Sequence, residues 1–167
     1  SQEEQLGEDI DDVRSILKNL VTLSKKQENL IYSTQNTTTS NPAYQKIINS
    51  QNTIKESMQT ISDSLYAISK RQPQVSKVIN DETFKVKENI DKSLESLLFF
   101  NQSYYTNYKN SKASTSQQYS MSSMNNLALL LAESLDNMNK QQQQMKSNKK
   151  NHSKNAKNQC NNPSQVK

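Results

Sequence analysis

The chain has 167 residues, about the length of one domain, and its composition excludes several classes of protein. Only 31% of the residues are hydrophobic and the mean hydropathy is −0.99. So few apolar side chains can fill narrow contacts between helices, but they cannot fill the broad core of an α/β enzyme. One glycine and three prolines are too few turn residues for a β-rich fold. The composition therefore predicts long helices joined by a few polar connections.

The net charge of +5 is unevenly distributed along the chain. Residues 140–167 carry seven lysines and no acidic residue, so the rest of the chain is slightly negative. Such a basic tail can bind nucleic acid or an anionic surface, or it can remain solvated. We favour the solvated tail, which makes nucleic acid the less favoured partner.

The first predicted helix follows an acidic, polar segment, residues 1–8, that we expect to be flexible. Carboxylates within residues 8–12 suit the N-terminus of a helix, and we expect this helix to end near Tyr32 or Thr34. Its apolar residues recur every three or four positions, which is the spacing of one helix face. The polar residues 35–40 predict a loop.

Two further helices are predicted on either side of Pro73. Asn41 is a good N-cap with Pro42 at the first helical position, so the second helix starts there. Pro73 cannot continue that helix, but it suits the first turn of the next one, predicted over residues 73–100. Short connections make neighbouring helices antiparallel, so residues 65–79 predict a sharp turn between two antiparallel helices.

The apolar stripes of the first three helices contain polar residues at positions that should face a neighbouring helix. These residues are Ser24, Gln27, Gln51, Thr83 and Ser93. Polar residues in a contact between helices lower stability, but they can fix the register of the helices. The sequence therefore predicts that these polar side chains are buried.

The fourth predicted helix begins near residues 115–118 and ends near Met145. Its stripe has helical spacing and includes Met124, Leu131 and Met138. The preceding connection, residues 101–116, is either a long loop or a frayed continuation of the third helix. Residues 146–167 are rich in Asn and Lys, cannot bury a core and predict a disordered tail.

These elements define an all-α protein. We expect an antiparallel bundle, or an elongated coiled-coil-like stack, of three to four long helices with a disordered basic tail. The predicted organisation is a flexible N-terminus over residues 1–8, a helical bundle over residues 9–145 and a Lys/Asn-rich tail over residues 146–167.

The sequence offers no residues for catalysis or for binding a cofactor. His152 is the only histidine and Cys160 the only cysteine, and both lie in the predicted tail. A catalytic base in an ordered site and a four-ligand zinc site are therefore not expected. The longest aliphatic run is far shorter than the roughly 20 residues of a membrane span. We expect no enzyme, no cofactor, no metal site and no membrane span.

Each predicted helix has an apolar face wider than a single contact between two helices requires. The residues that widen these faces are Ile16, Leu23, Leu30, Leu94, Leu98, Leu127 and Leu130. An exposed apolar stripe at helical spacing is a site for a partner helix. The sequence therefore predicts a structural or protein–protein interaction module that binds another helical protein or a second copy of itself. The alternative is a module that binds nucleic acid or an anionic surface through its basic tail.

Two stretches resemble a helical region of large envelope proteins from the Bacteroidetes, a family known as domain of unknown function four-one-seven-five. They are SLYAISKRQPQVSKVIN, residues 64–80, and QQYSMSSMNNLALLLAESLDNMNKQQQQM, residues 117–145. LKNLVTLSKKQENLI, residues 17–31, is similar to the helix that precedes them in that family. The resemblance implies that the chain is a fragment of a larger envelope-associated protein on the extracytoplasmic, periplasmic side. It implies no functional residue.

Overall fold

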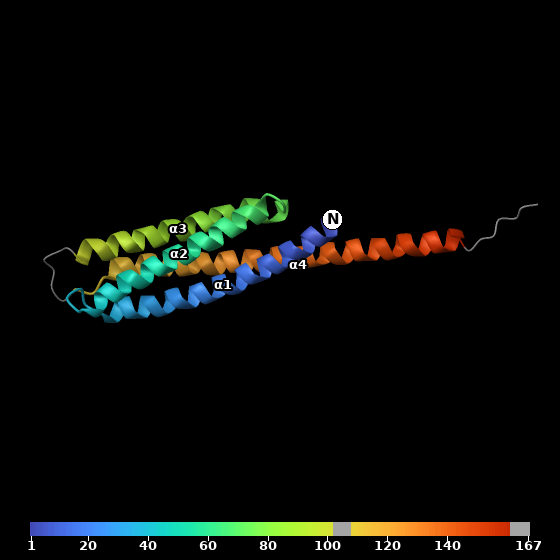
Figure 1. Cartoon of the computed structure of the whole chain (residues 1–167). Helices are drawn as coiled ribbons and strands as arrows, with labels where there is room; N and C mark the ends of the chain where they lie inside the picture. Colours follow the sequence, from blue (N-terminus) through green and yellow to red (C-terminus); the bar gives the residue numbers. More distant parts are fainter. Residues whose placement is uncertain (102–107, 161–167) are drawn as a thin grey trace, which may run out of the picture.

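The computed structural model describes residues 1–101 and 108–160, and nearly all of them lie in four long helices (Figure 1). The helices are α1 (Gln2–Asn36), α2 (Ala43–Ser69), α3 (Pro73–Asn101) and α4 (Ser111–Cys160). Each helix packs against two others, in the ring α1–α2–α3–α4, so that α1 lies diagonally opposite α3. The predicted all-α antiparallel bundle is thus confirmed, with four helices.

The core of the bundle consists of the stripes that the sequence predicts. Fully buried apolar side chains come from every helix and include Val13, Leu20, Met58, Val86, Leu97, Met124, Leu131 and Met138. The five polar stripe residues are buried as well, with Thr83 at 8% exposure and Gln27, Gln51 and Ser93 at 0%. The direction in which each helix faces is therefore confirmed, polar positions included.

The turn at Pro73 separates two helices, as the sequence predicts. α2 ends at Ser69 and α3 begins at Pro73. The backbone N–H groups of Arg71 and Gln72 both donate to the carbonyl of Ile68, each at 2.9 Å. These bonds satisfy a carbonyl that a helix C-terminus otherwise leaves without a partner. Residues 70–72 are termed the elbow below.

The N-terminus differs from the flexible segment that the sequence predicts, because residues 2–8 form the first turns of α1. The Ser1 hydroxyl accepts a hydrogen bond from the Glu4 backbone N–H, and the Glu4 carboxylate accepts one from the Ser1 amino group. This capping box satisfies donors at the start of the helix. Leu6 is only 2% exposed, so packing against the core anchors the same turn.

α4 begins earlier than residues 115–118 because Asn110 caps it. The Ala113 backbone N–H donates to Asn110 Oδ1 at 3.0 Å, which starts the helix at Ser111. The Asn110 amide also donates to the buried Tyr44 hydroxyl at 3.0 Å and so closes this end of the bundle. The sequence allows either a loop or a frayed helix for the connection that includes residues 102–107, and these six residues lie outside the described part of the chain.

α4 also continues past the predicted bundle, into residues 146–160 of the expected disordered tail. No glycine or proline interrupts this stretch, and its five lysines and Ala156 favour helix. The side chains of residues 146–156 are all exposed, and Figure 1 shows α4 projecting beyond the other three helices. Residues 146–160 are termed the overhang below, and residues 161–167 lie outside the described part of the chain.

Candidate interaction groove between α2 and α3

Most of the apolar residues predicted to bind a partner do not lie on the surface. Of the seven predicted residues, five are buried in the core: Ile16, Leu23, Leu30, Leu94 and Leu127. Leu130 is partly buried against the core, and Leu98 is exposed. The physical reason is that each helix has two neighbours in the ring, so a wide apolar face is divided between two contacts. These five residues therefore stabilise the closed bundle and offer no docking surface on it.

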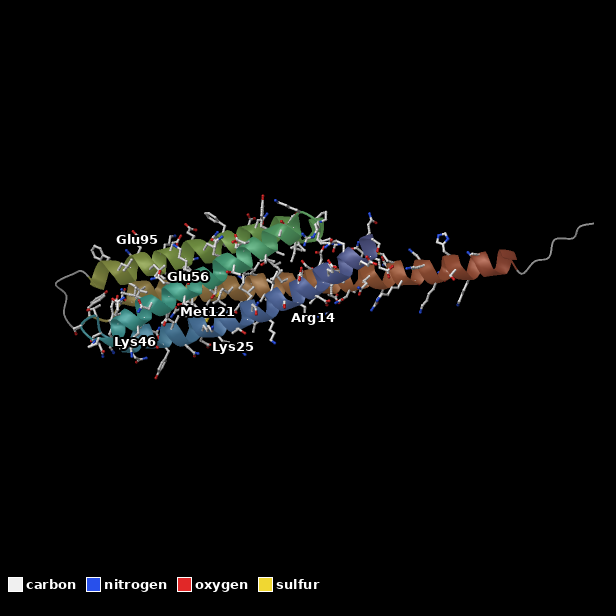
Figure 2. All side chains as sticks on the ribbon, in the orientation of Figure 1. Arg14, Lys25, Lys46, Glu56, Glu95 and Met121 are labelled. Carbon is white, nitrogen blue, oxygen red and sulfur yellow. The ribbon has the colours of Figure 1, made fainter. Side chains whose placement is uncertain are left out.

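A groove of about 680 Å³ instead runs along the outside of the bundle between α2 and α3. Its most deeply buried lining residues are Leu65 and Thr83, at 3% and 8% exposure. Tyr66 of α2 and Phe84 of α3 also line it, and these aromatic side chains are 60% and 68% exposed. In Figure 2 the labelled Glu95 marks the α3 side of the groove. The groove thus combines a floor of Leu65 and Thr83 with two exposed aromatic rings.

Six charged side chains also line the groove, and the acidic ones are in excess. They are Asp63, Lys87, Glu88, Asp91, Lys92 and Glu95. Lys55 Nζ lies 2.8 Å from Asp91 Oδ1 and joins α2 to α3, while Lys92 Nζ lies 3.3 Å from Glu88 Oε1. Both ion pairs are exposed and contribute little to stability. The carboxylates are therefore accessible to a cationic partner.

The groove also contains a buried hydroxyl that has no partner. Among the described residues no group forms a hydrogen bond with Thr83 Oγ1. Helical threonines often donate to the carbonyl four residues earlier, as Thr34 does to Leu30 at 2.8 Å. A buried hydroxyl without a hydrogen bond costs free energy. The Thr83 hydroxyl is enclosed between the helices, so this cost falls on the fold and is not a contact offered to a ligand.

A second polar cluster, the glutamine layer, lies inside the bundle. The side-chain amides of Gln27 of α1 and Gln51 of α2 donate to each other at 3.1 and 3.0 Å. Gln117 of α4 donates to Gln51 Oε1 at 3.0 Å, and the Ser120 hydroxyl donates to Gln27 Oε1 at 3.4 Å. The three glutamines are 0% exposed. This enclosed layer fixes the register of three helices and is not accessible to a ligand.

A buried carboxylate holds the elbow against α1. Asp9 is 0% exposed. It accepts hydrogen bonds from Arg71 Nη2 at 2.8 Å, from Gln72 Nε2 at 2.9 Å and from Gln5 Nε2 at 3.2 Å. Burial alone would raise the pKa of Asp9, but these three donors together outweigh it and lower the pKa below the usual 3.8. The ionised carboxylate is thus the form that the fold prefers.

We expect acid to remove the stabilisation that Asp9 provides. Because its pKa is lower in the folded chain than in the unfolded chain, the stabilisation is complete above the unfolded pKa and is lost as the pH falls through the folded pKa. Thermal unfolding of the parent chain and of Asp9→Asn, measured from roughly pH 6 down to roughly pH 2, tests this expectation. The difference in melting temperature should shrink in acid. A difference that is constant over this range would contradict the prediction.

A cluster of metal-ligating residues and a membrane-spanning helix are both absent from the described residues. No three His, Cys, Asp or Glu side chains in residues 1–101 and 108–160 gather into a group that could hold a metal ion. In the same part of the chain no helix is both long and apolar enough to cross a bilayer. The fold and the groove define the class of the molecule as a four-helix bundle with a lateral groove. Comparison with protein-family models, curated proteins and solved structures gives no match.

Proposed function

We propose that the chain is a protein–protein interaction module that binds a partner helix in the α2–α3 groove. The observation that carries this proposal is the exposure of Tyr66 and Phe84 beside the groove floor. Aromatic residues are enriched at protein interfaces, where they supply much of the binding energy. A groove between two packed helices that exposes aromatic side chains is a surface on which a helix can dock.

The dimensions of the groove favour a helix as the partner. On α3 the lining residues extend from Asn80 to Glu95. This stretch corresponds to about 22 Å at 1.5 Å per residue, or about four helical turns. The envelope association and the periplasmic location that the resemblance implies remain predictions, and they are compatible with a module that holds another protein.

A photo-crosslinking residue in place of Phe84 tests the proposal. We expect p-benzoylphenylalanine at this position of the full chain, produced in the organism that encodes it, to give one defined adduct. The control carries the same residue in place of Tyr119, which is 60% exposed on α4 and lies outside the groove. This control should give no adduct, since a partner in the groove would not reach it.

Specificity of the adduct is checked by filling the groove. Ser62 lines the groove from α2 and is partly exposed, so Ser62→Trp should block the groove and abolish the adduct at position 84. The mass of the adduct distinguishes a second copy of the chain from another protein. No adduct at position 84, or equal adducts at positions 84 and 119, would overturn the proposed function.

A further inference from the structure

The overhang is a cationic helix that no other helix accompanies. Residues 146–156 are all exposed and carry four lysines and no acidic residue. One ion pair, between Lys149 Nζ and Glu3 Oε2 at 3.5 Å, joins its base to α1. A short helix that is polar on all sides is only marginally stable in water by itself. A partner surface of opposite charge would therefore stabilise the overhang.

The lysines of the overhang match the carboxylates of the groove in spacing. Lys146, Lys150 and Lys154 recur every four residues, so they lie on one helix face, about 6 Å apart along the axis. On α3, Glu88, Asp91 and Glu95 all line the groove and lie about 4.5–6 Å apart. The fifteen residues of the overhang also span about 22 Å, the length of the groove on α3.

The overhang also suits the remaining groups of the groove. Lysines bind aromatic faces, as Lys70 does here, with its Nζ 4.4 Å from the Tyr66 ring centroid. The exposed Phe84 ring can accept a lysine of the overhang in the same way. A lysine-rich helix can therefore contact both the carboxylates and the Phe84 ring of the groove.

We propose that the groove of one copy binds the overhang of a second copy. The chain cannot satisfy its own groove, because α4 continues without a break from the bundle into the overhang and projects away from α2 and α3 (Figure 1). A second copy supplies the same helix without any rearrangement of the bundle. This inference rests on the proposed function and names the partner of its groove.

Charge reversal on each surface tests the inference. Sedimentation of the full chain at low salt should show concentration-dependent association above the 19.1 kDa monomer. The overhang variant Lys146→Glu/Lys150→Glu/Lys154→Glu should weaken association about tenfold or more, because attractive pairs become repulsive. The groove variant Glu88→Lys/Asp91→Lys/Glu95→Lys should weaken it similarly. Equimolar mixing of the two variants should restore association between them, which neither shows alone.

Matched controls separate this contact from a general effect of charge. Lys18→Glu/Lys25→Glu/Lys46→Glu changes the net charge equally at exposed lysines outside the groove and the overhang, and it should leave association unchanged. Circular dichroism and thermal unfolding of each variant confirm that the bundle is folded. Association should also weaken as salt shortens the Debye length from about 10 Å at 0.1 M to about 3 Å at 1 M.

The contrary outcomes distinguish failure of the second copy as occupant from failure of the groove as a binding site. A folded chain that stays monomeric at high concentration and low salt would overturn the second copy as occupant. The groove would still keep its proposed function if crosslinking at position 84 then captured another protein. Failure of mixing to restore association would likewise exclude the pairing of overhang and groove. Binding of duplex DNA or of phosphatidylserine vesicles that persists at roughly 150 mM salt and is lost in the overhang variant would assign the overhang to polyanions instead.

Discussion

Gln51→Leu is expected to destabilise the bundle by about 2–5 kcal/mol, because each buried polar group left without a partner costs about 1–3 kcal/mol. The change places an apolar residue in the core, but it removes the acceptor used by both Gln27 Nε2 and Gln117 Nε2. Gln27 would keep only the longer contact from Ser120, at 3.4 Å. The lost hydrogen bonds, and not a lost volume, therefore set the size of the effect.

The matched control replaces the whole glutamine layer. In Gln27→Leu/Gln51→Leu/Gln117→Leu no amide is left without a partner, and Ser120 can donate to a carbonyl of its own helix. We expect this variant to be close to the parent chain in stability, or more stable. Urea unfolding at one fixed protein concentration measures both variants. A triple variant less stable than the single one would show that the layer stabilises the fold outright.

Leu131→Ala is expected to cost about 2–5 kcal/mol, the usual range for a leucine truncated in a packed core. Leu131 lies on α4 and is 0% exposed. Its side chain fills space that the surrounding helices cannot fully recover, so both transfer free energy and a cavity contribute to the loss. Thermal and urea unfolding of the full chain measure the effect.

Leu129→Ala is a close control for this prediction. Leu129 lies two residues earlier on the same helix but is 71% exposed. The substitution has the same chemistry and the same helix propensity, so any difference between the two variants reports burial. A surface change of this kind stays within roughly 0.5 kcal/mol. Similar losses for the two variants would mean that the assigned face of α4 is wrong.

The direction in which the helices face could be predicted from the sequence, because it depends on local spacing. Steps of three and four placed Gln27 and Gln51 among the buried positions although both are polar. The turn at Pro73 was predictable for a similar reason, since proline restricts its own backbone and that of its neighbour. What spacing could not provide is the partner of each buried amide, which comes from a different helix.

The surface available to a partner was not predictable from the stripes. A wide apolar face fits a helix with one neighbour and an exposed stripe, and it fits a helix with two neighbours equally well. Only the ring order of the helices shows that Leu23 and Leu127 are enclosed. The helical state of residues 2–8 was missed for a related reason, because packing of Leu6 against the core anchors that turn and only the assembled bundle shows this packing.

The groove has a weaker signal in the sequence, which two aromatic residues carry. Tyr66 and Phe84 each follow a stripe residue, at positions where the neighbouring helix turns carry polar residues. A large aromatic side chain outside the buried stripe is worth noting, since it adds apolar surface without adding to the core. That the two aromatic residues face one groove depends on the antiparallel pairing of α2 and α3, which the structure provides.

The ring order of the helices has a consequence for how the chain acquires its structure. Ser24 and Asn125 form a hydrogen bond between α1 and α4 although 101 positions separate them. Contacts between α1 and α2 or between α2 and α3 close short loops, whereas the contact that completes the ring joins the first helix to the last. A chain growing on the ribosome exposes α1, α2 and α3 before α4 is made. The apolar faces that α4 covers are then open to water, so this intermediate is the stage at which aggregation competes with folding.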